Sequence, residues 1–304
     1  MEPAFDFLIK KEEVYSGALS CRGCGWALLV RHLSSILGED TVYVVPASCF
    51  SIIAGPYPLN ELKGSVVHTV FAAAPATATG IRAALDRKGK KDATVCVLAG
   101  DGGTFDIGFQ SLSGAATRGE NILYVANNNG AYMNTGIQSS TATPYGAVTT
   151  TNPSANFRKT WPKDLMGIIG SHNIPYAATC SLAFIEDYRR KIKKAMETEG
   201  FRFLMIDGPC PPGHKTDPAQ SISIGRLAVE SNLFPLFEIE HNHYHINYVP
   251  KNKHPVEDCL KLQRRFKHLF KEESGQTLKE IQQHTDKNWK RLLELEKMSA
   301  ELSN

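Results

Sequence analysis

The sequence lacks a long hydrophobic run and any large excess of charge. No stretch of about eighteen apolar residues occurs in the chain, which argues against a membrane-spanning helix. The first residues, MEPAFDFLIKKEEVYSG, lack the basic-then-apolar order of a secretory signal. With 34 basic and 31 acidic residues the net charge is +3, which disfavours a nucleic-acid-binding protein. We therefore expect a cytoplasmic protein that binds neither membranes nor nucleic acids.

Cysteine is scarce, with seven among 304 residues, and internal repeats and low-complexity linkers are absent. Cytoplasmic thiols are kept reduced, so we expect metal or redox roles for some cysteines rather than structural disulfides. The apolar content of 42% is ordinary for a globular protein. A chain of this length is expected to form one large domain or two.

Short β-branched runs alternate with helical stretches through the first two thirds of the chain. This alternation predicts an α/β fold with a mostly parallel sheet and helices on both faces. In such sheets ligands bind at the carboxyl ends of the strands. The predicted strands lie at residues 42–46, 93–100, 121–127, 174–180 and 201–208, and the predicted helices at 25–38, 76–89, 108–119 and 182–200.

The pattern changes at Leu233. Residues 233–250 predict a hairpin that turns near His241 and Asn242, and residues 256–272 and 276–302 predict two charged amphipathic helices. We therefore expect an α/β domain over residues 1–232. A hairpin and a helical extension over residues 233–304 are expected to pack on the same domain.

A Gly-Asp-Gly sequence follows the predicted strand 93–100. Gly100, Gly102 and Gly103 have no side chains, so their backbone N–H groups can approach a phosphate closely. Asp101 offers a hard carboxylate oxygen, and Asn129, just after the next strand, offers an amide oxygen. Oxygen ligands of this kind suit Mg²⁺ between protein and diphosphate. The alternative is a tight strand-to-helix turn with an Asp cap, followed by an Asn-rich turn.

Four of the cysteines lie in loop-like contexts. Cys21 and Cys24 form a C-x-x-C pair, whereas Cys49 and Cys210 each follow a predicted strand. Four thiolates at one sheet edge would satisfy a [4Fe–4S] cluster or a structural Zn²⁺, and free thiols remain the third alternative. The other cysteines are expected to act as small buried hydrophobic residues: Cys96, Cys180 and Cys259.

Two longer patterns resemble a known family. The segment from Asp101 to Asn129 resembles the thiamin-diphosphate motif, which joins Gly-Asp-Gly to a later Asn. Residues 132–147, YMNTGIQSSTATPYGA, are similar to the Asn-Thr-Gly-Gly-Gln-Ser-Ser-x-Ala-Thr-Pro segment of the 2-oxoacid:ferredoxin oxidoreductases. The resemblance is to the β subunit that binds thiamin diphosphate, and it runs from about Gly17 into the C-terminal helices. It implies the thiamin-diphosphate-binding fold.

The resemblance also implies roles for individual residues. The Mg²⁺ ligands would be Asp101, Asn129 and the carbonyl oxygen of Ala131. Asn134 would project toward the reacting end of the cofactor as a catalytic residue. The residues implied to lie against the cofactor are Gly25, Cys49, Gly100, Asp101, Gly102, Gly103, Asn129 and Asn134. Those implied to hold a [4Fe–4S] cluster are Cys21, Cys24, Cys49 and Cys210.

The family's reaction is oxidative decarboxylation of a small 2-oxo acid, with electrons passed through the cluster to ferredoxin. Pyruvate-like acids and oxalate are both implied substrates, and coenzyme A accepts the acyl group in pyruvate-type members. Thiamin enzymes need a glutamate on the aminopyrimidine ring, which no motif of this chain supplies. The resemblance thus implies an α-type partner subunit that carries this glutamate and substrate contacts, and another subunit with ferredoxin-like clusters.

Two other functions are compatible with the same residues. One is a non-redox thiamin-dependent decarboxylase or acyl transferase whose cysteines bind zinc or stay free. The other is a non-catalytic electron-transfer or scaffold subunit with a decayed thiamin site. The histidines of HNHYH (241–245) are interpreted as surface residues of the hairpin, and His68 as a helix cap or a cofactor contact.

Overall fold

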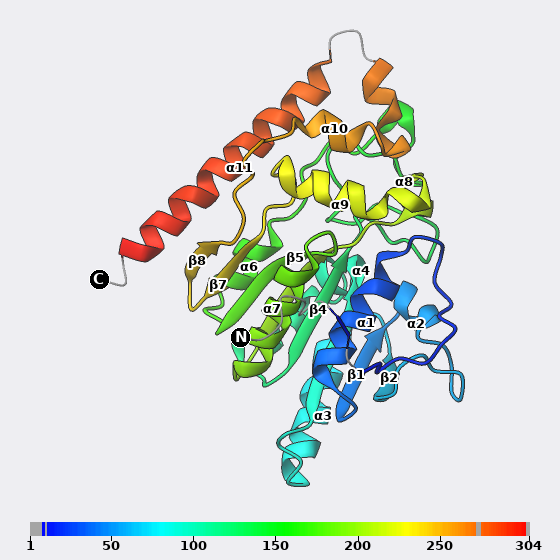
Figure 1. Cartoon of the computed structure of the whole chain (residues 1–304), viewed down its shortest axis with the longest axis vertical. Coiled ribbons are helices and arrows are strands. Elements are labelled where there is room, and N and C mark those ends of the chain that lie inside the picture. Colours follow the sequence, from blue (N-terminus) through cyan, green and yellow to red (C-terminus); the bar gives the residue numbers. More distant parts are fainter. Residues whose placement is uncertain (1–7, 10, 272–274, 302–304) are drawn as a thin grey trace.

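The computed structural model describes residues 8–9, 11–271 and 275–301, which form one eight-stranded sheet flanked by helices (Figure 1). The strand order is β2-β1-β3-β4-β6-β5-β7-β8. The first six strands are parallel, whereas β7 and β8 extend the sheet antiparallel. The strands are β1 (Thr41–Pro46), β2 (Ser65–Thr69), β3 (Thr94–Gly100), β4 (Leu123–Asn128), β5 (Tyr176–Ser181), β6 (Arg202–Asp207), β7 (Phe237–Glu240) and β8 (His243–Ile246).

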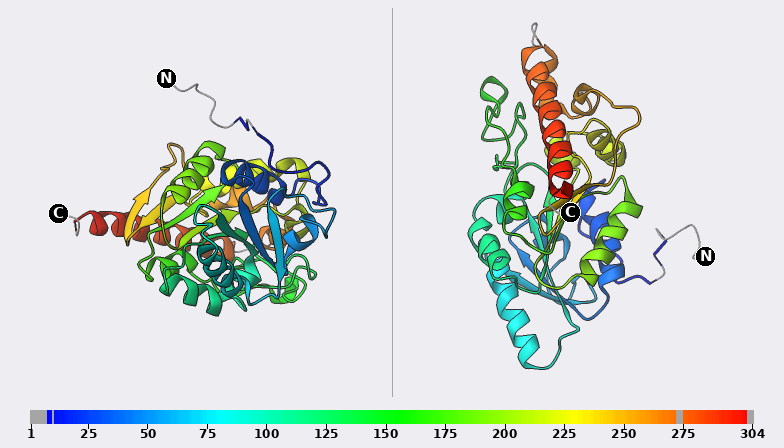
Figure 2. Two further views of the ribbon diagram at one scale, coloured as in Figure 1. Left: turned by 90° about the horizontal axis from the view of Figure 1, so that it is seen from below. Right: turned by 90° about the vertical axis from the view of Figure 1, so that its left-hand side faces the viewer.

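Helices cover both faces of this sheet (Figure 2). The α-helices are α1 (Gly25–Leu37), α2 (Cys49–Ile53), α3 (Ala74–Arg87), α4 (Asp101–Phe105), α5 (Phe109–Thr117), α6 (Leu165–Gly170), α7 (Ile185–Glu197), α8 (Pro211–His214), α9 (Ser221–Glu230), α10 (Val256–Leu260) and α11 (Gln276–Glu301). Three short 3₁₀ helices are η1 (Ser154–Asn156), η2 (Pro218–Gln220) and η3 (Arg264–Lys271).

The side chains of strand β3 contribute to two hydrophobic cores, one on each face of the sheet. Side chains alternate across a strand, so Val95 and Val97 point to one face and Cys96 and Leu98 to the other. The first face packs against α3, α5, α6 and α11, and the second against α1, α2 and α7. Because both faces are covered, the strand is apolar along most of its length. The predicted α/β fold is confirmed.

All five predicted strands of the parallel sheet are confirmed, as are the helices α1, α3, α5 and α7. The edge strand β2 was not predicted. Its sequence, SVVHT, is short and only partly buried, so it lacks the apolar run that marks the inner strands. His68 lies in this edge strand with an exposed side chain, so it does not cap a helix.

The C-terminal part confirms the predicted hairpin and corrects one helix. His241 and Asn242 have φ values of 46° and 66°, which fit the two-residue turn between β7 and β8. The helix predicted over 256–272 is wrong as a single element, because α10 ends at Leu260 and η3 follows. Phe266 and Leu269 are both buried and three residues apart, which matches the period of a 3₁₀ helix. Residue 272 lies outside the described residues.

The outer edge of β8 is covered by α11. The backbone N–H of Tyr244 donates to Oγ of Ser299 at 3.0 Å, and that of Ile246 donates to Oε1 of Glu296 at 2.6 Å. These bonds satisfy donors that an edge strand would otherwise leave open. The division between residues 1–232 and 233–304 stays a prediction.

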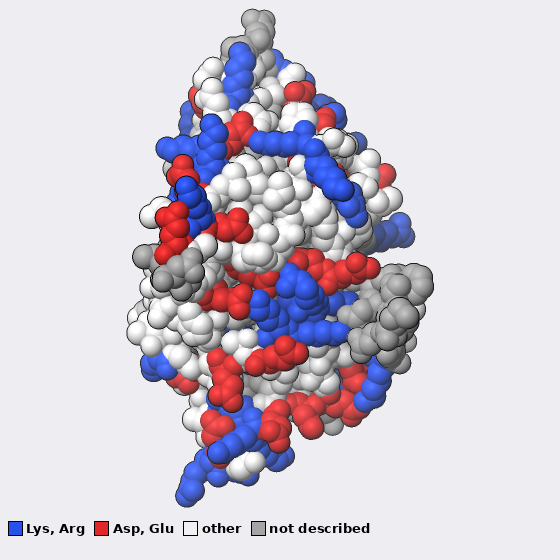
Figure 3. All heavy atoms as spheres, turned by 60° about the vertical axis from the view of Figure 1, so that its left-hand side comes forward, with Lys and Arg blue, Asp and Glu red and all other residues white. Residues whose placement is uncertain are grey.

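Charges of both signs lie beside each other on the face shown in Figure 3, with an uncharged area among them. Ion pairs such as Arg190–Glu238 and Lys194–Glu240 join α7 to β7. Within residues 8–9, 11–271 and 275–301, no helix has the length and apolar composition that a bilayer crossing requires.

Candidate functional site

Asp101 lies at the carboxyl end of β3, where it is the first residue of α4. Its side chain is 2% exposed. Oδ1 accepts a hydrogen bond from the backbone N–H of Asn129 at 3.0 Å, and Oδ2 accepts one from Oγ of Ser140 at 3.2 Å. Because β3 and β4 are adjacent and parallel, the residues that follow them meet at one edge. The structure thus brings Asp101 and Asn129 together.

Burial raises the pKa of Asp101 to about 7, and hydrogen bonds from Asn129, Ser140 and the backbone of Ala131 oppose this rise. A desolvated carboxylate that accepts several N–H and O–H donors is held in one orientation. A divalent cation at this position would favour the ionised form. The chemistry of this carboxylate therefore fits a cation ligand.

The side-chain oxygen of Asn129 has no hydrogen-bond partner, although the residue is only 7% exposed. A buried polar atom without a partner is costly, so a missing ligand is the natural explanation. The backbone carbonyl of Asn129 is already occupied. It lies 2.7 Å from Nε2 of His214 and accepts a weak hydrogen bond from Nη1 of Arg265 at 3.5 Å. The free amide oxygen fits the Mg²⁺ ligand that the motif implies.

The glycines of the motif differ in the space around them. At Gly102 a Cβ atom would lie 2.1 Å from the ring of Tyr132 and 2.6 Å from that of Phe71, so protein packing alone requires glycine there. At Gly103 the nearest neighbour of a Cβ atom would be Pro46, at 3.4 Å. At Gly100 the nearest atom would be Cβ of Ser48, at 3.7 Å, which is ordinary contact.

Asp106, the residue after α4, forms hydrogen bonds with the segment that follows β4. The hydroxyl of Tyr132 donates to Oδ2 of Asp106 at 2.8 Å, and the backbone N–H of Thr141 donates to the same atom at 3.2 Å. Between these anchors the chain makes an exposed turn that carries Asn134. Asn134 is therefore on a loop whose two ends are bonded to Asp106, and it is exposed to solvent.

Ile137 in this turn has an unusual backbone, with a φ of 65°. A β-branched residue in the left-handed region is strained, because Cβ crowds the backbone. The similar segment of the 2-oxoacid:ferredoxin oxidoreductases has glycine at this position, which adopts such a φ at no steric cost. Strain of this kind is concentrated at functional sites.

The four loop cysteines come from three places in the sequence that the fold brings together. Cys24 donates its backbone N–H to the carbonyl of Cys21 at 3.1 Å, and the next residue, Gly25, donates to the carbonyl of Pro209 at 3.3 Å. The start of α1 therefore lies against the loop that carries Cys210. Cys21 is exposed, whereas the thiols of Cys24, Cys49 and Cys210 are partly buried.

The pKa values of these thiols show that they lie within electrostatic reach of each other. Burial raises the pKa of Cys49 to about 12, with further contributions from Cys210, Cys24 and Cys21. Burial likewise raises the pKa of Cys210 to about 11. In the described part of the chain no group of three His, Cys, Asp or Glu side chains is already arranged around a metal position. Thiolates are a donor set that suits iron–sulfur or zinc chemistry.

The remaining cysteines and histidines lie elsewhere. Cys96, Cys180 and Cys259 are fully buried within the hydrophobic cores, as small hydrophobic residues would be. His243 and His245 are exposed on β8, and Nδ1 of His243 lies 2.9 Å from the carbonyl of Ser299.

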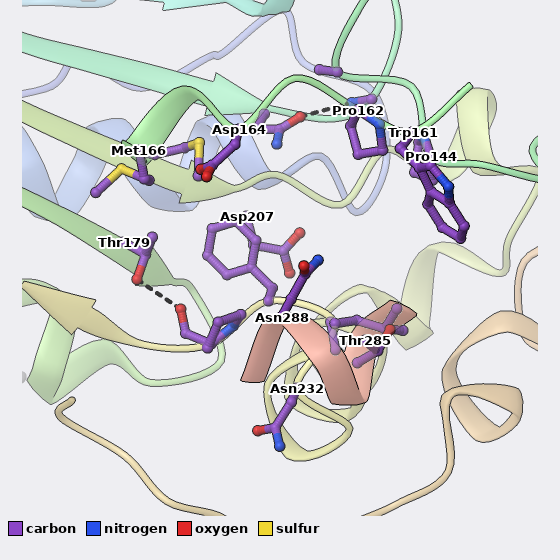
Figure 4. A pocket seen from close by; sticks show the side chains of 18 of the residues that line it. Pro144, Trp161, Pro162, Asp164, Met166, Thr179, Asp207, Asn232, Thr285 and Asn288 are labelled. Carbon is purple, nitrogen blue, oxygen red and sulfur yellow. Dashed lines mark hydrogen bonds between the residues drawn. The ribbon is translucent and has the colours of Figure 1, made fainter. Parts of the chain in front are cut away.

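A large cavity next to this edge includes residues that the sequence analysis missed. Its volume is about 470 Å³, and it lies between the ends of β5, β6 and β7 and the helices α6, α9 and α11 (Figure 4). Asp207, His214 and Arg265 line it, as does Asn129. Asp207 ends β6 and precedes Gly208, so the reasoning applied to Asp101 could have found it. Arg265 had no such signal.

Comparisons with known proteins agree with this geometry. The family described as thiamine pyrophosphate enzyme, C-terminal TPP binding domain, matches residues 47–206, more than half of the chain. A 2-oxoglutarate:ferredoxin oxidoreductase from Magnetococcus marinus has a similar structure, with a TM-score of 0.58 and 24% sequence identity. The match covers 71% of this chain and 79% of that one, and it shows a shared fold.

Relatives of higher identity cover nearly the whole chain. The pyruvate synthase subunit PorB of Methanothermobacter thermautotrophicus is 42% identical over 280 residues, 91% of this chain and 96% of that protein. The ketoisovalerate oxidoreductase subunit VorB of Pyrococcus furiosus is 42% identical over 295 residues, 94% of each. Thiamine pyrophosphate binding and the oxidoreductase activity of a multisubunit enzyme follow from this family. The chain belongs to the thiamine pyrophosphate enzymes and, among them, to the β subunits of the 2-oxoacid:ferredoxin oxidoreductases.

Proposed function

We propose that this subunit oxidatively decarboxylates a small 2-oxo acid and delivers the electrons, one at a time, through a [4Fe–4S] cluster to ferredoxin. One relationship supports this proposal most directly: the predicted diphosphate site at Asp101 and the predicted cluster site at Cys49 lie at the same edge of the sheet. Gly100 precedes Asp101 and Ser48 precedes Cys49, and a Cβ atom added at Gly100 would lie 3.7 Å from Cβ of Ser48. The charge of Asp101 also contributes to the raised pKa of Cys49.

Thiamin diphosphate would be bound through Mg²⁺ at the end of β3. Asp101 and the free amide oxygen of Asn129 would be ligands, together with the carbonyl of Ala131. Gly100 and Gly103 would lie against the diphosphate, because a Cβ atom at either position would meet the protein only at ordinary contact distances. Ser140 would keep the carboxylate of Asp101 oriented through its hydrogen bond at 3.2 Å.

The cluster would be held by Cys21, Cys24, Cys49 and Cys210. The pKa values of Cys24, Cys49 and Cys210 are raised, so these thiols are protonated in the absence of metal. Cluster binding would therefore release protons, and this makes assembly favour higher pH. Zinc at the same thiols is the alternative, and a zinc protein of this family would be a non-redox decarboxylase or acyl transferase.

When bound, the thiazolium ring supplies a nucleophilic carbon and an electron sink, and the cluster supplies a one-electron acceptor. The protein then has to position these groups and exclude water. Asp106 anchors both ends of the turn that carries Asn134, and this side chain would lie near the substrate end. Its amide would orient the acid, which makes it the proposed catalytic contact from this chain.

Partner subunits complete the proposed site. An α-type subunit would supply the activating glutamate and substrate contacts, and a further subunit with ferredoxin-like clusters would carry electrons onward to ferredoxin. The substrate is proposed to be a small 2-oxo acid, either pyruvate-like or oxalate, with coenzyme A as acyl acceptor for the pyruvate-like acids. The relatives above are named for pyruvate and ketoisovalerate.

The test is anaerobic turnover of the purified complex with pyruvate, 2-oxoisovalerate, 2-oxoglutarate and oxalate, with and without coenzyme A. Reduction of a viologen dye by one of these acids is expected. A complex that reduces the dye with none of them would refute the proposal. Visible absorption provides a second criterion, because an iron–sulfur protein is brown and bleaches on reduction, whereas a zinc protein is colourless.

A further inference from the structure

The cavity beneath the C-terminal extension is separate from the thiol cluster. Its floor is formed by the ends of β5 and β6, with Thr179, Met205 and Asp207, and α11 contributes Thr285 and Asn288 (Figure 4). Its volume of about 470 Å³ is within the range of sites that bind small molecules. Among the residues that line it, the proposed reaction gives a role to Asn129 and to no other.

Two opposite charges line this cavity without pairing. The side chain of Arg265 is 8% exposed, and no carboxylate of the described residues forms an ion pair with it. Among the described residues, no side chain or backbone group forms a hydrogen bond or an ion pair with the carboxylate of Asp207. Both groups line the same cavity, and the charge of each also affects the pKa of the other. A ligand that carries both charges would have a partner of opposite charge for each.

Other polar atoms at this cavity also lack partners. Nδ1 of His214 and Oδ1 of Asn232 are unpartnered, although each residue is 5% exposed. Both residues line the cavity. Buried groups without partners are costly, and a ligand with hydrogen-bond donors would satisfy them. The polar end of the cavity is therefore rich in acceptors and contains one guanidinium donor.

Part of the remaining lining is apolar, with the side chains Met166, Met205, Leu233, Phe234, Phe237 and Leu292. Polar side chains, such as those of Thr285 and Asn288 on α11, lie among them. The apolar part favours an aliphatic or aromatic group attached to the polar end of the ligand.

We propose that the cavity binds an apolar α-amino acid in its zwitterionic form. Arg265 would take the carboxylate, Asp207 would take the ammonium group, and the apolar wall would contact the side chain. A simple carboxylic acid would leave Asp207 without a partner. A simple amine would leave Arg265 with its hydrogen bonds to Gln263 and Asn129 but without a carboxylate partner. A zwitterion satisfies both and brings no net charge into the cavity.

Binding would also be linked to the cofactor loop. Arg265 donates to the carbonyl of Asn129 at 3.5 Å, and Nε2 of His214 lies 2.7 Å from the same oxygen. An amino acid bound to Arg265 would therefore change the hydrogen bonding of the Asn129 backbone, and the side chain of Asn129 carries the free amide oxygen of the proposed Mg²⁺ site.

The test is isothermal titration calorimetry of the full chain, without added cofactors, against three probes. L-Leucine carries both charges, 4-methylpentanoate lacks the ammonium group, and 3-methylbutylamine lacks the carboxylate. Leucine is expected to bind saturably and each analogue at least about 10-fold more weakly, since a charged hydrogen bond is lost. Absence of saturable leucine binding would overturn the proposal, as would equal affinity for 4-methylpentanoate.

Variants locate the site without relying on enzyme activity. Asp207→Asn should weaken leucine binding at least about 10-fold and leave binding of 4-methylpentanoate unchanged or tighter. Asp164→Asn is the matched control, because Asp164 lines the same cavity but is 55% exposed and paired with Arg291. It should bind leucine like the unmodified chain. Thermal melting establishes that both variants fold, and wild-type leucine affinity in Asp207→Asn would contradict the assignment.

Discussion

The backbone N–H of Asn129 donates a hydrogen bond to Oδ1 of Asp101 at 3.0 Å, across 28 residues of sequence. This bond joins the ends of two neighbouring parallel strands. The side-chain oxygen of Asn129 itself has no protein partner. The Gly-Asp-Gly motif and the later asparagine are therefore one structural unit. Its two side-chain oxygen groups are what a hard cation requires.

Asp101→Asn should lower the affinity of the chain for Mg²⁺ and thiamin diphosphate by at least about 100-fold, since it removes the charged ligand. Fold stability should not fall at neutral pH, because burial already disfavours the charge of Asp101. Cofactor retained after gel filtration, measured by thiamin analysis, gives the result. Asp86→Asn, on an exposed helix surface, is the control. Unchanged retention in Asp101→Asn would rule out its role as a ligand.

Cys210→Ser and Cys24→Ser should each reduce iron in anaerobically purified protein from about four atoms per chain to less than about one. Loss of one thiolate leaves a cluster of this kind without a complete ligand set. Cys259→Ser is the matched control, because Sγ of Cys259 lies 3.7 Å from the carbonyl of Ile224 in the core and serine can donate similarly. If iron falls equally in all three variants, the cysteines act through folding and the cluster assignment is wrong.

The parallel strands and the Asp101 site could be predicted because local sequence determines them. Apolar β-branched runs mark inner strands, and a motif of adjacent glycines around one acid marks the turn after β3. The contact of Ser140 with Asp101 could not be predicted although Ser140 lies in the motif of residues 132–147, since it depends on tertiary structure. Arg265 could not be predicted either, since it reaches the site through tertiary contacts and stands in no local pattern. Edge strand β2 was missed for a related reason, as its side chains are only partly buried. Asp207 had a local signal, the Asp-Gly after β6.

Ile137→Gly should make the protein more stable than Ile137→Ala by about 1 kcal/mol. Both changes remove the same branched side chain, but only glycine relieves the strain of a φ of 65°. Denaturant unfolding of the two variants measures the difference. Equal stability would show that the turn adopts another backbone conformation in solution. In the complex, Ile137→Gly is expected to change KM for the acid more than cofactor retention, because the turn carries Asn134 and not the Mg²⁺ ligands.

Asp207→Asn should raise the thermal stability of the chain, and the gain should depend on pH. Burial raises the pKa of Asp207 from 3.8 to about 7, although the charge of Arg265 opposes the rise. Below pH 3.8 the folded and unfolded states both hold the proton, so this group contributes fully to stability. Between 3.8 and about 7 the unfolded state releases the proton first, so stability falls as the pH rises.

The asparagine variant has no proton to lose at this position. The difference in Tm between Asp207→Asn and the unmodified chain should therefore grow from about pH 4 to pH 7 and then level off. Asp101, whose pKa is also raised, is present in both proteins and cancels in the difference. Asp164→Asn, which changes a side chain of the same cavity that is 55% exposed, is the matched control. A constant difference for Asp207→Asn would mean that its carboxylate is ionised throughout this range, already paired with Arg265, and an amino-acid ammonium group would then find no free acceptor there.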